Sequence, residues 1–136
     1  MAGRQGRHGA RRLLLQALYQ HQVAGHGADE LLDQFCAQPQ FAQVDGDYFR
    51  ELLTEILASR QWLDERIAAG ADRPLAQLDP VERAVLWIGI AELTRRSDVP
   101  ARVAINEAIE LAKEFGAQDS YRYVNAILDG VSGEAR

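Results

Sequence analysis

The chain has 136 residues, a length typical of one compact domain, and 47% of them are hydrophobic, which is enough to build a buried core. Its longest uninterrupted apolar run, Ala84 to Ala91, is far shorter than the ~20 residues of a membrane span, and no signal-peptide segment follows the N-terminus, so we expect a cytoplasmic protein without membrane contact. The net charge of −5 conceals a basic end, because residues 1–12 hold four arginines and no acid, and this asymmetry is typical of a polyanion-binding arm on an acidic body.

The first nine residues contain three glycines and show no apolar periodicity. We therefore expect a flexible basic segment over residues 1–9 and a single helical domain over residues 10–136. The helical pattern begins at Ala10, and Gly25 with Gly27 should end that first helix. Its apolar positions recur at steps of three and four residues: Ala10, Leu13, Leu14, Ala17 and Leu18.

Three further helices are expected before residue 71. The second covers residues 29–37 behind a cap at Asp29, and the third starts at a cap formed by Asp45. The fourth runs through Trp62 to Gly70. The buried stripe of the third helix contains Phe49, Leu52, Leu53, Ile56 and Leu57.

The C-terminal half has clearer helix boundaries. Asp79 followed by proline is a strong helix start, and the run from Ala84 to Ala91 is apolar on every side, which places that helix at the centre of a bundle. Pro100 should open the next helix and Gly116 should end it in the left-handed conformation. Asp119 or Ser120 should cap the last helix. With no convincing strand pattern, the sequence predicts an all-α fold of about seven helices.

No set of residues typical of catalysis or metal binding is found. The chain lacks a phosphate-binding loop of the Gly-Lys-Ser/Thr type, and no serine lies in a nucleophile-elbow context. The three histidines lie within the first 26 residues, without cysteine pairs or zinc-ligand spacing. The acidic pairs on residues 107–114 are typical of a solvated helix face. We therefore expect no enzymatic activity, no metal and no cofactor.

One face of the first helix carries residue types that suit nucleic acid. Arg12, Gln16 and Tyr19 follow at steps of four and three, so they share a stripe, with Arg11 beside it. Arginine pairs with phosphates, glutamine reads base edges and tyrosine stacks on bases, a mixture that suits single strands. Arg4 and Arg7 could reach the same ligand from the flexible segment. The alternative, that these arginines only keep the segment soluble and that Tyr19 is half-buried, stays open.

Several motifs resemble the bacterial transcription antitermination family NusB. Their order and spacing match over nearly the whole chain and are weakest between residues 25 and 42. The motifs are QALYQ at 16–20, LDPVERAVL at 78–86, RSDVP at 96–100, VAINEAIELAK at 103–113, FGA at 115–117 and YVNAILD at 123–129.

The resemblance implies a compact bundle in two packed sub-bundles and an adaptor function. NusB-like proteins bind the boxA element of nascent RNA together with NusE, a small-subunit ribosomal protein, and promote antitermination in ribosomal RNA operons. Other Nus factors and RNA polymerase would be indirect partners, and a homodimer is a further possibility. The resemblance leaves two alternatives open: an RNA-binding domain of the kind attached to ribosomal RNA methyltransferases, and a purely structural helical scaffold.

The resemblance also implies particular contact residues. The RNA surface would comprise Arg7, Arg11, Arg12, Gln16, Tyr19, Asp119, Arg122 and Tyr123. Glu82 falls where the family meets its protein partner or the RNA nearby, and Tyr19 would also contact the protein partner. Trp87 departs from the family pattern, which often has a basic residue at this position, and it would contact a partner if exposed. Asn106 and Asn125 are expected to be buried hydrogen-bonding residues.

Overall fold

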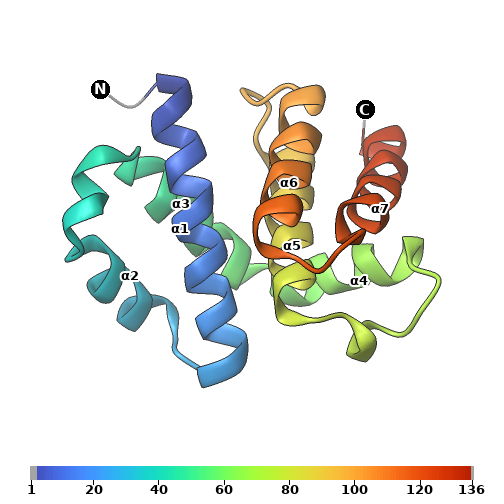
Figure 1. Cartoon of the computed structure of the whole chain (residues 1–136), viewed down its shortest axis with the longest axis horizontal. Helices are drawn as coiled ribbons and strands as arrows, with labels where there is room; N and C mark the ends of the chain where they lie inside the picture. The colour runs from blue at the N-terminus through green and yellow to red at the C-terminus, as the bar shows by residue number, and fades with distance from the viewer. Residues whose placement is uncertain (1–2, 136) are drawn as a thin grey trace. The chain divides into compact units, whose positions relative to one another are not determined.

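The structure is a computed structural model that describes residues 3–135, with side chains described for residues 6–133. The described chain contains seven α-helices and two short 3-10 helices, without a strand, and this confirms the all-α prediction. It forms two compact units, Met1–Ala58 and Ser59–Arg136 (Figure 1). The elements are α1 (Gly3–Ala24), α2 (Ala28–Cys36), η1 (Pro39–Gln43), α3 (Gly46–Ala58), α4 (Arg60–Gly70), η2 (Leu75–Gln77), α5 (Pro80–Arg95), α6 (Ala101–Phe115) and α7 (Ser120–Ala135).

In the first unit, α1 packs along α3, and α2 contacts both helices. The predicted stripe of α1 is buried, including Leu14 and Leu18, and α3 residues such as Phe49 and Leu52 are buried in the same unit. The helix ends at Gly25, whose φ of 77° is the left-handed conformation that favours glycine. Asp45 caps α3 as predicted, because its side-chain oxygen accepts from the backbone N–H of Tyr48 at 3.0 Å.

Helix α1 begins earlier than the sequence pattern indicated. We expected helical structure from Ala10, whereas the structure places residues 3–9 in α1 as well. The reason lies in tertiary contacts rather than in local apolar periodicity. The backbone N–H of Asp45 donates to the carbonyl oxygen of Gly6 at 2.9 Å, and a Cβ on Gly9 would lie 2.6 Å from Val44. The small residues of this segment thus let the loop before α3 approach the helix.

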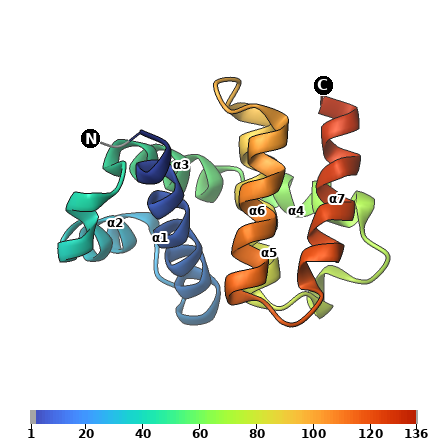
Figure 2. The same ribbon diagram turned by 45° about the horizontal axis from the view of Figure 1, so that its top comes forward.

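In the second unit, α5 is the central helix, and α4, α6 and α7 all pack on it (Figure 2). The run from Ala84 to Ala91 is buried, as its all-round apolar character predicted. Asp79 caps this helix by accepting from the N–H of Glu82 at 2.7 Å, and Pro80 occupies the first turn. Helices α5 and α7 approach closely at Gly89, where a Cβ would lie 2.7 Å from a methyl group of Leu128.

The loop between α6 and α7 differs from the prediction. Gly116 ends α6, but its φ of −89° and ψ of 175° are extended rather than left-handed. The left-handed residue is Asp119, with φ 71°. Gly116 is needed for space, because a Cβ there would lie 2.7 Å from the carbonyl oxygen of Ala112. The expectation for Asn106 is wrong, since this residue is exposed on α6, and Asn125 is only half-buried.

Candidate nucleic-acid interface

The outer face of α1 carries the predicted stripe in solvent. Arg12 and Gln16 are exposed, and Tyr19 is 44% exposed although it is large and apolar. Val23 extends the same stripe one further turn and is 60% exposed. The structure therefore brings a guanidinium, an amide and an aromatic ring together on one accessible face, as the helical spacing predicted.

Two other arginines of α1 pack against a buried tyrosine. Tyr48 on α3 is only 2% exposed, and the guanidinium of Arg7 lies 4.3 Å from the centre of its ring. Arg7 also lies 3.8 Å from a carboxylate oxygen of Asp45 and stays half-buried. Arg11 lies 5.7 Å from the same ring. Tyr48 and Asp45 thus hold the arginines that the sequence assigned to RNA.

Arg11 requires a correction. It was predicted to face RNA, but the residue is 3% exposed. Adjacent residues point about 100° apart on an α-helix, so the contact with Tyr48 turns Arg11 inward while Arg12 stays outside. Arg11 is therefore a structural residue in this chain. The side chain of Arg4 lies outside the described side chains.

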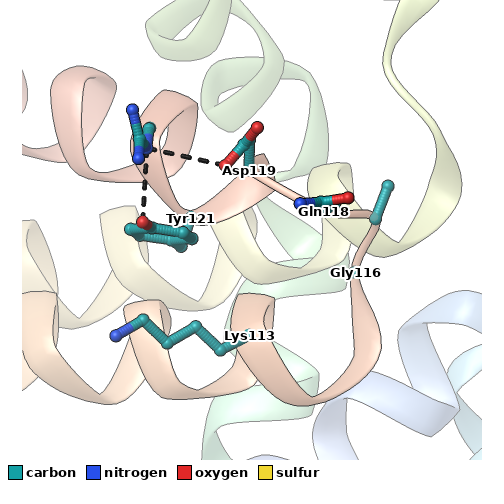
Figure 3. Close-up of a pocket in the computed structure, with 7 residues that line it drawn as sticks. Lys113, Gly116, Gln118, Asp119 and Tyr121 are labelled. Atoms are coloured by element: carbon teal, nitrogen blue, oxygen red, sulfur yellow. Dashed lines mark hydrogen bonds and ion pairs between the residues drawn. The ribbon is translucent and has the colours of Figure 1, made fainter.

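The second candidate surface lies in the other unit, at the loop that leads into α7. A hollow of about 410 Å³ is lined by Lys113 at the end of α6, by the loop from Gly116 to Asp119, and by Tyr121 and Arg122 in the first turn of α7 (Figure 3). The first turn of a helix presents backbone N–H groups that have no partner within the helix, and these favour anions. Two of the predicted RNA residues, Asp119 and Arg122, border this hollow.

Tyr121 contacts both cations that line the hollow, Lys113 and Arg122. Figure 3 shows its ring beside the side chain of Lys113, whose ammonium nitrogen lies 4.9 Å from the ring centre. The Nε of Arg122 donates to the hydroxyl oxygen of Tyr121 at 3.2 Å and lies 3.6 Å from a carboxylate oxygen of Asp119. The contacts with Tyr121, and then the charge of Asp119, raise the pKa of Arg122 above its ordinary value. The hollow thus keeps two positive groups around one ring.

Tyr123 is half-buried, and its ring is already in contact with a cation. The guanidinium of Arg73, from the loop after α4, lies 3.9 Å from the ring centre. This distance places Arg73 on the face of the ring, and the Tyr123 hydroxyl is buried without a hydrogen-bond partner. Tyr123 was predicted to stack on a base, but Arg73 already occupies one face of its ring.

Glu82 was predicted to meet a protein partner, but it is 7% exposed and its carboxylate is engaged inside the unit. It accepts a hydrogen bond from the hydroxyl of Ser120 at 2.8 Å and lies 3.5 Å from Arg73. A buried carboxylate needs such partners, since burying an unpaired charge is costly. The expectation of a direct partner contact is thus replaced by a structural role: Glu82 connects α5 to the start of α7.

Trp87 was expected to contact a partner only if exposed, and it is 1% exposed. Its indole N–H donates to a carboxylate oxygen of Asp64 on α4 at 2.8 Å. Arg83 donates to the same carboxylate at 3.1 Å and lies over the indole ring. Trp87 is therefore a core residue that connects α5 to α4, which rules out a surface contact.

Sequence reasoning missed Lys113 and Tyr121, which line the hollow, and Arg73, which lies on the ring of Tyr123. Lys113 and Tyr121 come from different helices, so no helical spacing relates them. Arg73 lies in the loop between α4 and η2, to which the sequence assigned no role. Lys113 and Tyr121 lie on either side of the loop between α6 and α7. This placement alone predicts no contact between them, because the contact depends on the conformation of the loop.

Among the residues that the structure describes, no group of three His, Cys, Asp or Glu side chains lies close enough to hold a metal ion. No described helix is long and apolar enough to cross a membrane. The described chain is thus a helical scaffold with two surfaces that combine cations with tyrosines, a mixture typical of nucleic-acid-binding proteins.

Comparison with known proteins gives the family. The model of the NusB family matches residues 8–133, so the chain belongs to the NusB family. It is 49% identical over 127 residues to the transcription antitermination protein NusB of Alcanivorax borkumensis, covering 93% of this chain and 85% of that protein. It is 48% identical over 120 residues to NusB of Halorhodospira halophila, covering 88% and 77%.

The fold agrees with this membership. A solved structure of NusB from T. maritima superposes with a TM-score of 0.88 at 28% sequence identity, covering all of this chain and 96% of that one. The relatives carry the name of a transcription antitermination protein, which denotes a regulatory protein rather than a catalyst.

Proposed function

We propose that this protein is an RNA-binding adaptor of transcription antitermination in ribosomal RNA operons, and that it binds boxA RNA together with the ribosomal protein NusE. It acts without catalysis and would work in the cytoplasm, where bacterial transcription takes place. The names of the relatives favour this function over that of a methyltransferase-associated domain.

The observation that carries the proposal is the exposed stripe of α1. Arg12, Gln16 and Tyr19 supply a phosphate partner, an amide for base edges and a stacking surface, and all three are exposed. The apolar end of the stripe at Tyr19 and Val23 is suited to a protein partner, because exposed large apolar side chains are unfavourable in water.

The hollow before α7 supports the proposal as a second anion-binding surface. Lys113 and Arg122 are exposed cations next to Tyr121, and the N-terminus of α7 adds partial positive charge. Asp119 opposes an anion at this place, which would keep the affinity of the isolated protein for RNA modest until NusE adds its own contacts.

The test is a binding measurement with a U-rich boxA RNA and a scrambled RNA of equal length, each with and without NusE. We expect a preference for boxA and a gain in affinity from NusE. If neither appears, the proposed function is wrong. Log affinity should fall with log salt by about 0.7 per neutralised phosphate, or roughly 2 in all for Arg12, Lys113 and Arg122.

A further inference from the structure

We propose that Arg73 binds a backbone phosphate of the RNA, and that Tyr123 serves as the platform for its guanidinium rather than as a stacking surface for a base. The inference rests on the proposed RNA-binding function and adds a residue from the loop between α4 and η2. Arg73 belongs to none of the motifs that indicated an RNA surface.

The position of Arg73 is fixed from two sides. Its guanidinium lies 3.9 Å from the centre of the Tyr123 ring, and one of its terminal nitrogens lies 3.5 Å from a carboxylate oxygen of Glu82. Glu82 is itself held by the hydroxyl of Ser120 at 2.8 Å. The side chain of Arg73 thus contacts the first turns of both α5 and α7. Because these contacts already restrict its conformation, Arg73 would lose less conformational entropy on binding a ligand.

The pair formed by Arg73 and Glu82 is uneven in its access to solvent. The side chain of Glu82 is 8% exposed, whereas that of Arg73 is 36% exposed. The negative charge is therefore covered and the positive charge is partly exposed, while the Nε of Arg73 is buried without a hydrogen-bond partner. Because arginine is not deprotonated in proteins, this guanidinium stays charged at every working pH.

A guanidinium can serve several acceptors at once. It carries five N–H donors in one plane, so an arginine that lies flat on a ring and pairs with one carboxylate keeps donors for a further acceptor at its edge. Phosphate oxygens match this geometry. Because Arg73 covers a face of Tyr123, a base could stack on that face only after Arg73 had left both the ring and Glu82.

The first test measures the salt dependence of boxA binding in the full chain. Arg73→Ala should flatten the slope of log affinity against log salt by about 0.7, the value for one phosphate contact on a single strand. Arg73→Lys should keep the slope and weaken binding a few-fold, because lysine keeps the charge but lacks the planar fork. An unchanged slope in Arg73→Ala would overturn the proposal.

Two controls separate a phosphate contact from other effects. Arg102→Ala removes the same charge from the first turn of α6, at the other end of the helix from the hollow. The distance along the helix from Arg102 to Gly116 is about 20 Å, so this variant should leave the slope unchanged. Arg73→Ala leaves Glu82 buried beside one partner fewer, so Arg73→Ala/Glu82→Gln provides a variant without the unpaired charge. This double variant should show the same loss of slope, and a restored slope would overturn the proposal.

A double-mutant cycle tests the role of Tyr123. If the ring acts through Arg73, Tyr123→Leu should weaken binding in the wild-type background and have no effect in the Arg73→Ala background. A further loss of roughly tenfold in the second background would mean that Tyr123 stacks a base itself, and it would overturn this part of the proposal.

The failure of this proposal differs from the failure of the proposed function. Wild-type protein that shows no preference for boxA and no gain from NusE refutes the function. Wild-type protein that shows both, with an Arg73→Ala slope equal to that of wild type, refutes only the role of Arg73. Wild-type protein that binds no RNA refutes both.

Discussion

Arginine meets tyrosine in both compact units, but the two encounters differ in which partner faces solvent. In the first unit, Arg7 and Arg11 lie on Tyr48, which is buried under α1. In the second unit, Lys113 and Arg122 flank Tyr121, which is only half-buried, and both cations are exposed. The same pair of residue types therefore stabilises a helix contact in one unit and borders an accessible hollow in the other.

The difference teaches that an arginine-rich segment is not by itself a binding surface. Arg11 and Arg12 are adjacent, yet the first is buried and the second is exposed. We infer that an arginine stabilises the fold when the ring on which it packs belongs to the core, and that it is accessible to a ligand when it does not. The predictions below test this distinction, from the largest expected effect to the smallest.

The largest effect is expected from removing the buried ring of Tyr48, in comparison with removing the half-buried ring of Tyr121. Tyr48→Ala deletes a buried aromatic side chain together with the support of two arginines, and it should lower the free energy of unfolding by about 3–5 kcal/mol. Tyr121→Ala removes a half-exposed ring and should cost less than about 1 kcal/mol. Urea unfolding followed by far-UV circular dichroism measures both. Equal losses of unfolding free energy in the two variants would contradict the distinction between a core ring and a surface ring.

The same experiment can be followed by fluorescence, because both tryptophans, Trp62 and Trp87, lie in the second unit. If the two units unfold together, Tyr48→Ala should shift the fluorescence and dichroism transitions equally. A shift in dichroism alone would mean that the first unit unfolds by itself.

The second prediction separates the adjacent arginines of α1. Arg11→Ala should lower the free energy of unfolding by about 1–2 kcal/mol, because its guanidinium packs on a desolvated ring, and it should leave the salt slope of RNA binding unchanged. Arg12→Ala should do the reverse, flattening the slope by about 0.7 with a stability change within about 0.5 kcal/mol. A flatter slope in Arg11→Ala would restore that residue to the RNA surface.

The smallest effect concerns the acid at the start of α7. Asp119→Asn removes a negative charge from a helix N-terminus, and asparagine accepts the left-handed φ of 71° as readily as aspartate. Binding of boxA RNA should become about two- to fivefold tighter. Asp129→Asn, an exposed site late in the same helix, is the matched control and should bind like wild type. Weaker binding by Asp119→Asn would show that the carboxylate itself contacts RNA.

The sequence alone determined the fold class and most helix boundaries, because these depend on short-range signals. The caps at Asp45 and Asp79 and the helix end at Gly25 are local chemistry, and all three lie where they were predicted. The apolar character of Ala84 to Ala91 was enough to place α5 at the centre of its unit. The stripe from Arg12 to Tyr19 required only the helical period of 3.6 residues.

Tertiary structure alone decided which polar residues the fold uses internally. Arg11, Glu82 and Trp87 were considered for a surface site, but each is buried against a group from another helix. Arg11 lies on the ring of Tyr48, Glu82 accepts from the hydroxyl of Ser120, and the indole N–H of Trp87 donates to Asp64. Arg73 became a candidate only because a loop carries it onto Tyr123. Such pairings join residues that no sequence period relates, and an unpaired charge or donor is too costly to bury. The basic end of the chain was therefore visible in its sequence, whereas the division of its arginines between buried and exposed positions was set by packing against Tyr48.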